Sequence, residues 1–518
     1  MLSFSFTLFL LLLATSHANT ANPQPKIIVQ LIIDDLGHAD TTLNPDVTAP
    51  DVPTPHLQKL LSQGVRLTNM HSQPVCSPTR SSLMTGRFPF RMGMQHTNTI
   101  MPGSTAAIPL TTPTVPELLP SSFVVKAAVG KWHLGYASTA NIPTSRGFDH
   151  FVGYLQGQVD YYNKTIARGF DFWDGPSQYR KAVGNYSLPQ YMSAVEKYLN
   201  EFTNKAKTDE MARMYLYLSH QTVHIPLEAA GEDSRCGHIN DYWRRVYCSM
   251  LVELDDSIGH LTSLLDAAVG DDWVVLCMGD NGGMVRFRTD ENSTSNEPFW
   301  PASAGDNRPL RGSKTTLFQG GVKATAFVSG SSSMIPVTAR GTSYDGLMHA
   351  CDFAATVLGL GGVDSSELAA LSTSMDGLDH WSAIVGGQSK SLRDHVPINL
   401  INNGTTYSAI RYGDFKLIVG SPTVTALADG WFQGGLYPAV QKAPVHTKGI
   451  NYLFNVTRDP YEHEELDLEK YKDIVQDGLK LIRDYVTHQK GDYQEPQPNR
   501  PHLKALPIFH GGAWVPFL

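Results

Sequence analysis

Short continuous apolar runs alternate along the chain with longer segments of helical hydrophobic spacing. Runs of β-branched and aliphatic residues, typical of strands buried on both faces, lie at residues 26–33, 123–129, 214–218, 273–278 and 322–328. Residues 189–205 favour a helix, and apolar positions from 241 to 268 predict a long amphipathic one. Strands separated by helices predict an α/β fold with a large doubly wound, mostly parallel sheet flanked by helices.

The pattern changes beyond Gly387. Residues 408–419 read as a hairpin that turns at Gly413-Asp414, and residues 466–488 read as one helix. The chain is therefore predicted to consist of a leader at residues 1–18, an α/β domain at 24–387 and a smaller C-terminal α+β subdomain at 388–518. That subdomain is expected to hold a small antiparallel sheet and a helix.

The leader contains an apolar run of about ten residues, whereas a helix that spans a bilayer needs about 20. Ser16 and Ala18 form a small-x-small cleavage pattern, so the mature chain is expected to begin near Asn19. No later apolar run in the sequence is long enough to cross a membrane. We therefore expect a protein of the secretory pathway, lysosomal or extracellular, with no transmembrane segment.

Composition narrows the range of partners. Apolar residues make up 42% and charged residues 17% of the 518 positions, which fits a globular protein. The formal net charge of −8 argues against nucleic acid as a partner. The 19 histidines would make the net charge positive near pH 5, so an acidic compartment would make the surface more favourable to a polyanion.

Five cysteines remain in the predicted mature chain. Cys236 and Cys248 are close enough in sequence to close a small loop, which favours a disulfide in an oxidising compartment. Cys277 lies in an apolar run and Cys351 in a predicted helix, so both are expected to be buried thiols. Cys76 is then the odd cysteine. Sequons for N-glycosylation stand at Asn163, Asn185, Asn292, Asn403 and Asn455.

The segment that begins at Cys76 reads C-S-P-T-R-S-S-L-M-T-G-R. Residues 65–70 before it favour a strand, and the residues after it favour a helix that ends at Gly86. A cysteine between a strand and a helix lies beside free backbone N–H groups that favour an anion, and Arg80 lies one turn further along. The alternative for such a triplet is a buried structural cysteine followed by a capped helix.

Polar residues follow the other predicted strands where each one ends: Asp34 and Asp35, Lys131 and His133, His224, and Asp280 and Asn281, with Lys314 on a later loop. Taken singly, each has an ordinary structural explanation as a turn or cap residue, a solvated lysine or a hydrogen-bonded histidine. Ligands of open α/β sheets bind at the carboxyl ends of the strands. Three carboxylates with an amide oxygen suit Ca²⁺ or Mg²⁺ rather than a softer metal. Two lysines and an arginine match a tetrahedral anion, and two histidines can move protons.

These segments resemble the motifs of the sulfatase family, in the family's order. The segment at Cys76 matches C-x-P-x-R-x-x-x-x-T-G in every fixed position. The other motifs are Asp-Asp-x-Gly, G-K-W-H-L-G, V-H-x-P-L, G-D-N-G-G and P-L-R-G-x-K. Residues 143–154 and 309–322 look most like the arylsulfatase B group, which includes N-acetylgalactosamine-4-sulfatase. The chain has fewer cysteines than that group, and Thr315-Thr316 follows Lys314, which bears on sugar specificity.

The resemblance implies an alkaline-phosphatase-like fold and a role for each residue. Cys76 would be oxidised to formylglycine by the formylglycine-generating enzyme during secretion, and the hydrate would be the nucleophile. Arg80 and His133 would position that hydrate, and His224 would protonate the departing alcohol. Calcium, in preference to Mg²⁺, would be held by Asp34, Asp35, Asp280, Asn281 and the modified Cys76. Sulfate would be bound by Lys131, Lys314 and His224.

The activity implied is hydrolysis of sulfate from a sulfated sugar, a glycosaminoglycan or an aryl sulfate. Two other classes stay open at this point. A metal-dependent phosphodiesterase or phosphatase of the same superfold could share the carboxylates and the cysteine position. A non-catalytic glycan-binding relative would be expected to have lost a ligand, and all the ligands named above are present.

Overall fold

The computed structural model describes residues 24–285, 303–420 and 452–518, apart from residues 48, 96–98, 365, 368–369, 371–374, 389, 402–406 and 488–492. The predicted leader and the sequons at Asn292 and Asn403 lie outside the described residues. Among the helices of the described ranges, none combines the length and apolar character needed to span a bilayer.

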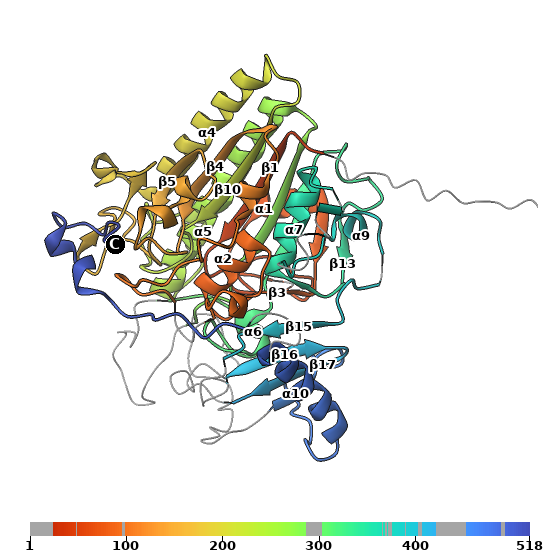
Figure 1. The fold of residues 1–518 in the computed structure, drawn as a ribbon. Helices are drawn as coiled ribbons and strands as arrows, with labels where there is room; N and C mark the ends of the chain where they lie inside the picture. The colour runs from red at the N-terminus through yellow and green to blue at the C-terminus, as the bar shows by residue number, and fades with distance from the viewer. Residues whose placement is uncertain are drawn as a thin grey trace, which may run out of the picture.

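A ten-stranded sheet forms the centre of the molecule, in the order β13-β2-β12-β11-β1-β10-β4-β5-β8-β9 (Figure 1). The predicted strands are present at its centre: β1 (Ile27–Ile33) pairs in parallel with β10 (Arg213–His220) and with β11 (Trp273–Gly279), and β10 pairs in parallel with β4 (Phe123–Lys131). On one side β12 (Ala326–Gly330) and β2 (Gly64–Leu67) continue the sheet with antiparallel pairs. The register places Ile33 opposite both His220 and Gly279, so three strands end at one level.

Apolar side chains of the central strands pack on both faces of this sheet. Ile27, Val29, Leu31 and Ile33 belong to one core cluster, and Ile28 and Ile32 belong to a second on the other face, as the period of two along a strand requires. The first cluster includes side chains of α1 (Pro55–Ser62), α4 (Ser187–Ala206) and α5 (Tyr242–Val269). The second includes side chains of α2 (Cys76–Thr85), α7 (Ala350–Leu360) and α9 (Trp381–Val385). This is the doubly wound α/β arrangement that the sequence predicts.

The remaining elements are short. The outer strands of the large sheet are β5 (His150–Tyr154), β8 (Trp173–Asp174), β9 (Ser177–Gln178) and β13 (Thr342–Tyr344). Two small pairs are β3 (Met70–His71) with β14 (Met348–His349), and β6 (Thr165–Ile166) with β7 (Gly169–Phe170). The short helices are α3 (Val115–Leu118), α6 (Gln319–Val322), and the 3-10 turns η1 (Pro89–Arg91), η2 (Thr139–Asn141), η3 (Pro143–Ser145), η4 (Arg180–Ala182), η5 (Ser234–Cys236), η7 (Leu503–Ala505) and η8 (Pro507–Phe509).

A separate four-stranded antiparallel sheet forms the small C-terminal subdomain beside α6 (Figure 1). It contains β15 (His395–Ile398), β16 (Ser408–Tyr412), β17 (Phe415–Val419) and β18 (Tyr452–Asn455), and α10 (Lys472–Val486) packs on it. The hairpin at 408–419 is confirmed by the pairing of β16 with β17. The domain boundary at residue 387 stays a prediction.

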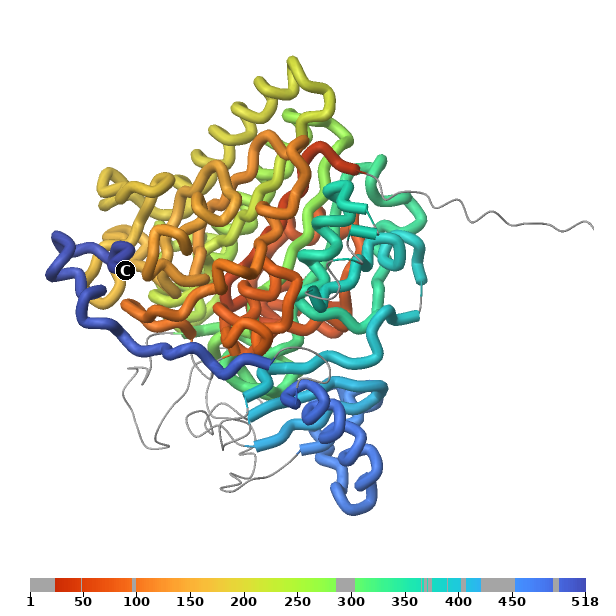
Figure 2. Tube along the Cα trace, in the orientation of Figure 1, coloured from red at the N-terminus to blue at the C-terminus, as the bar shows by residue number. Residues whose placement is uncertain are grey.

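The end of the chain leaves this subdomain and returns to the large one (Figure 2). The Gln497 side chain donates hydrogen bonds to the carbonyl oxygens of Met92 and Ala107 at 2.7 and 2.8 Å, and the Trp514 backbone N–H donates to Phe170. Residues 497–518 therefore contact the α/β domain, although the prediction assigned them to the C-terminal subdomain.

Three predicted elements need correction. Residues 65–70 form two strands, β2 and β3, rather than one. The strand predicted at 322–328 begins only at Ala326, because Val322 ends α6. The helix predicted at 466–488 is α10, which begins at Lys472. By contrast, the disulfide between Cys236 and Cys248 is confirmed, and Cys76, Cys277 and Cys351 are buried free thiols.

Candidate active site

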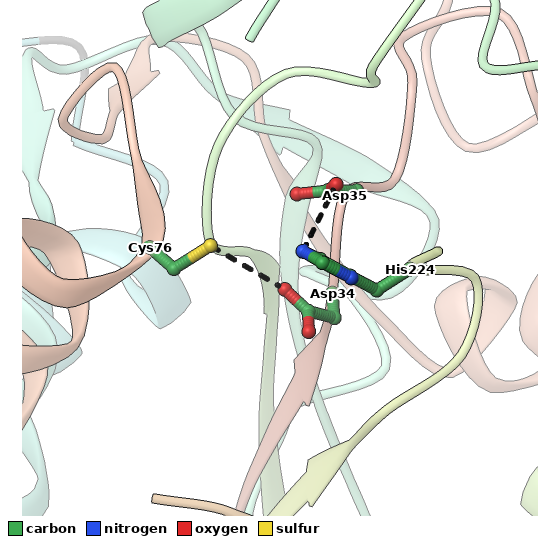
Figure 3. Close-up of side chains that lie close together, drawn as sticks. All are labelled: Asp34, Asp35, Cys76 and His224. Carbon is green, nitrogen blue, oxygen red and sulfur yellow. Dashed lines mark hydrogen bonds and ion pairs between the residues drawn. The ribbon is translucent and has the colours of Figure 1, made fainter. Parts of the chain in front are cut away.

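The predicted site residues meet at the level where β1, β10 and β11 end. Asp34 and Asp35 follow β1 directly, and Cys76 is the first residue of α2. Figure 3 shows Asp34, Asp35, Cys76 and His224 converging, and one ligand atom from each lies within 4.8 Å of the others. The Cys76 Sγ atom is 3.8 Å from Asp34 Oδ1. All four side chains are buried.

Arg80 links two of the predicted carboxylates. It lies one turn into α2 and is fully buried. Its Nη2 atom is 3.2 Å from Asp34 Oδ1 and 2.8 Å from Asp280 Oδ2, and its Nε atom donates to the same Asp280 oxygen at 2.8 Å. Burial lowers the pKa of Arg80, but Asp280 and Asp34 more than compensate, so the pKa is raised and the guanidinium keeps its charge.

Each lysine of the site pairs with one aspartate. Lys131 ends β4, and its Nζ atom is 2.7 and 3.0 Å from the two oxygens of Asp34. Lys314 Nζ is 2.6 and 2.8 Å from the oxygens of Asp35. Burial lowers the pKa of Lys314, yet Asp35 and the other acidic neighbours raise it overall. Two ammonium groups are thus held near Cys76.

His224 is held in one orientation by its backbone neighbours. Its Nδ1 atom donates to the carbonyl oxygen of Ile225 at 2.7 Å, so Nε2 faces the site. Nε2 accepts a hydrogen bond from Lys314 Nζ at 3.1 Å and lies 3.6 Å from Asp35 Oδ2. Burial lowers the pKa of His224, Lys314 lowers it further, and Asp35 opposes them without reversing the shift.

His133 lies just beyond the end of β4. In an extended segment Lys131 and His133 would lie on one face, but β4 ends at Lys131 and His133 has a φ of 56°. The rule that residues i and i+2 of a strand point to the same face therefore does not apply to this pair. His133 Nε2 donates to the carbonyl of Ile100 at 3.1 Å, and burial, followed by Lys131, lowers its pKa well below the usual value. The imidazole is accordingly neutral.

The residues present fit a hard divalent cation. Asn281 Nδ2 donates to Asp35 Oδ1 at 2.7 Å and to the Gly282 carbonyl at 2.9 Å, which fixes the amide orientation. The other amide atom, Asn281 Oδ1, is buried without a hydrogen-bond partner among the described residues. A buried acceptor without a partner is costly unless a ligand satisfies it. Beside Asp34 and Asp35, this oxygen belongs to the type of donor set that Ca²⁺ prefers.

The Cys76 thiol itself is unreactive in this setting. Burial raises its pKa to about 12, and the lowering effect of Lys131 and Lys314 does not offset this. Because the thiolate is the nucleophilic form of cysteine, an unmodified Cys76 would stay protonated and inert at neutral or acidic pH.

Sequence reasoning missed the residues that hold the site residues in place. Ser219 at the end of β10 accepts a hydrogen bond from Arg80 Nη1. Tyr161 donates from its hydroxyl to the carbonyl oxygens of Gln221 and His224 at 3.1 and 3.0 Å, which anchors the His224 loop. The position of Ser219 at a strand end could have singled it out. Tyr161 has no such signal, because it precedes His224 by 63 residues.

Comparison with known proteins agrees with this geometry. The sulfatase family model matches residues 26–363. Arylsulfatase J of Mus musculus is 30% identical over 97% of this chain and 82% of its own length. N-acetylgalactosamine-6-sulfatase of Canis lupus familiaris is 26% identical over 93% of this chain and 89% of its own. The crystal structure of a sulfatase from Pseudoalteromonas sp. superposes with a TM-score of 0.65 at 24% identity, over 92% of both chains.

The chain therefore belongs to the sulfatase family, as its motifs predict. It is a sulfuric ester hydrolase. The narrower likeness to N-acetylgalactosamine-4-sulfatase is not confirmed, since the relatives named here are an arylsulfatase J and a 6-sulfatase.

Proposed function

We propose that this sulfatase removes sulfate from a sulfated carbohydrate, using a formylglycine made from Cys76 and a calcium ion. The overall reaction breaks the S–O bond of the ester with one water molecule and yields an alcohol and inorganic sulfate. The observation that carries the proposal is the burial of three cationic side chains around Cys76. Arg80, Lys131 and Lys314 all lie in ion pairs there, and each is at most 7% exposed.

A divalent cation fits the oxygens of Asp34, Asp35 and Asn281, and Asp280 completes the proposed ligand set. When bound, the ion would neutralise charge on sulfate oxygens, and the formylglycine hydrate would supply the attacking hydroxyl. The high pKa of the Cys76 thiol supports a modified residue here, because the unmodified side chain offers no thiolate.

The chain's own residues bind the anion and move the proton. Lys131 and Lys314 present ammonium groups to the sulfate oxygens, where they stabilise charge that develops during transfer. Arg80, fixed by Asp280, and the neutral His133 orient residue 76. In its protonated form His224 would carry the transferable proton on Nε2, because Nδ1 already donates to the Ile225 carbonyl. It would protonate the leaving alcohol as a general acid.

The substrate class is proposed from the relatives. One acts, by its name, on the 6-sulfate of N-acetylgalactosamine. The motif likeness noted above points instead to the 4-sulfate of the same sugar. A sulfated N-acetylgalactosamine residue of a glycosaminoglycan therefore satisfies both indications, and parallel assays with 4-sulfated and 6-sulfated sugars distinguish the two positions.

We also propose that the protein matures in the secretory pathway and works in a lysosome or outside the cell. The disulfide between Cys236 and Cys248 supports an oxidising compartment. Asn163 and Asn185 are exposed, as glycosylated sequons must be. The formylglycine-generating enzyme would be an obligatory partner on this route.

Peptide mass spectrometry across residue 76 tests the proposal. Protein made in a eukaryotic secretory host is expected to carry formylglycine at that position, and Cys76→Ala is expected to be inactive on sulfate esters. An unmodified thiol in fully active protein would contradict the assignment of the nucleophile. Phosphate-ester hydrolysis well above sulfate-ester hydrolysis would favour the phosphatase class instead.

A further inference from the structure

The loop that carries Lys314 lies between two bodies of structure. On the side of the α/β domain, the Lys314 backbone N–H donates to the Gly283 carbonyl at 3.2 Å, and the Thr315 N–H donates to Pro74 at 2.7 Å. Gly283 follows the predicted calcium ligand Asn281, and Pro74 precedes Cys76. On this side, the two hydrogen bonds therefore fix the position of the loop relative to Cys76.

The other side of the loop is held by the C-terminal subdomain. The Gln319 backbone N–H donates to Glu462 Oε2 at 2.7 Å, and Lys416 Nζ is 2.7 Å from Glu462 Oε1. Both charged side chains of this pair are fully buried. The Tyr407 hydroxyl donates to the Thr315 carbonyl at 3.3 Å.

Arg311 adds a third attachment, three residues before Lys314. Its guanidinium lies 4.0 Å from the ring centroid of Phe318 and within 6 Å of the rings of Tyr452 and Phe454 on β18. Nη1 also pairs with Glu465 Oε1 at 3.0 Å. Leu317 and Phe318 belong to the core cluster that the small sheet contributes.

The ion pair of Lys416 and Glu462 is fully buried, and that makes it informative. A buried ion pair gives little net stability compared with apolar residues of similar size. We therefore interpret this pair as one that positions the backbone it contacts. Here the pair of Lys416 and Glu462 ends on the backbone of Gln319, five residues after Lys314. The C-terminal subdomain thus holds the two ends of the Lys314 loop, at Arg311 and at Gln319.

We propose that the C-terminal subdomain positions Lys314 for sulfate binding through Glu462, Glu465 and Tyr407, which makes these three positioning residues of the active site. The inference deepens the proposed function and rests on the assigned role of Lys314. An ammonium group displaced by a fraction of an ångström binds the transferred anion less well, because stabilisation of developing charge depends on fixed geometry. Binding of the sugar part of the substrate is not expected to change.

The test uses the full-length, calcium-loaded enzyme with inorganic sulfate as a competitive inhibitor. Glu462→Gln, Glu465→Gln and Tyr407→Phe are each expected to raise the inhibition constant of sulfate, by about tenfold for Glu462→Gln and less for the other two. The losses in kcat/KM should be equal for a sulfated sugar and an activated aryl sulfate, since the sulfate group is common to both. If Glu462→Gln does not fold, the two milder variants decide the result.

Tyr412→Phe is the matched control. Tyr412 lies on β16 of the same sheet, but its hydroxyl donates to the Ile474 carbonyl of α10 at 2.7 Å rather than to the loop. It should lower the melting temperature and leave the sulfate inhibition constant unchanged.

Lys314→Ala separates the two ways in which the inference can fail. If Lys314→Ala raises the sulfate inhibition constant while the Glu462, Glu465 and Tyr407 variants do not, the positioning role is overturned and the proposed function stands. If Lys314→Ala itself leaves the constant unchanged, the proposed role of Lys314 is overturned, and the inference with it.

Discussion

Replacement of His224 by alanine should divide substrates according to their leaving group. With Nδ1 committed to Ile225, Nε2 is the ring atom that can deliver a proton. General acid catalysis is worth about 10²–10⁴-fold when the leaving oxygen is poor, as in a sugar alkoxide. That range corresponds to about 3–5 kcal/mol of transition-state stabilisation. A nitrophenolate leaves without a proton, so hydrolysis of nitrophenyl sulfate should be largely spared.

The assay compares kcat/KM for a sulfated sugar and for nitrophenyl sulfate in each variant. Lys131→Ala is the matched control, because its ammonium pairs with Asp34 rather than donating to His224. It should depress both substrates alike. Lys314→Ala should do the same, although Lys314 also donates to His224. Equal losses on both substrates in His224→Ala would move the acid to another residue, with His133 the first to test.

The pH profile gives the same prediction a second readout. A general acid acts in its protonated form, and burial together with Lys314 lowers the pKa of His224 below its usual value. Turnover of the sugar substrate should therefore fall as pH rises through that lowered pKa, and the optimum should be acidic. The nitrophenyl substrate should lack this dependence. Persistence of the same limb for the sugar in His224→Ala would refute the assignment.

Two further substitutions test the metal site and the acid stability of the fold. Asp34→Asn should weaken calcium binding and regain part of its activity at high Ca²⁺, whereas wild-type activity that survives exhaustive chelation would contradict a metal site. Burial raises the pKa of Asp171 to about 6. The protonated carboxyl therefore makes its full contribution to the free energy of unfolding below about pH 4, and this contribution is lost as pH rises through 6. Asp171→Asn should remove this loss of about 3 kcal/mol, seen as a flatter dependence of the melting temperature between pH 4 and 6. An unchanged slope would mean that Asp171 is ionised throughout.

The fold could be predicted where burial and strand formation coincide. Continuous apolar runs at β1, β4, β10 and β11 are strands because each is covered on both faces. The same signal failed at Val322, which is fully buried but packs with the small sheet and has its N–H bonded to Phe318. The predicted helix likewise began too early, at Leu466, because the backbone N–H of this residue donates to the Leu453 carbonyl instead of belonging to a helix. Burial by a second subdomain cannot be distinguished from strand or helix periodicity in one sequence.

The site residues could be predicted because parallel strands deliver their ends to one edge of the sheet. Their partners could not, because those depend on strand order and register. The Asp35 backbone N–H donates to Asp280 Oδ1 across 245 residues of sequence, since β11 and β1 are neighbours and end together. The anchoring of the Lys314 loop by Glu462 likewise needs the placement of a second sheet, of which the sequence pattern at 408–419 shows only the hairpin.

The charges of the site explain why the proposed sulfate ligands are also the partners of the proposed metal ligands. Three cations, Arg80, Lys131 and Lys314, pair with the three carboxylates of Asp34, Asp35 and Asp280. Burial of each charge is tolerated because its partner lies within 3.2 Å. The lysines are accordingly held in place before an anion arrives, which is the preorganisation that electrostatic catalysis requires. It also follows that removal of any of these carboxylates removes a proposed metal ligand and at the same time frees the cationic side chain that it holds. In Asp34→Asn, the part of the activity that added calcium restores measures the contribution of the metal. The part that calcium does not restore measures the effect of the displaced lysine.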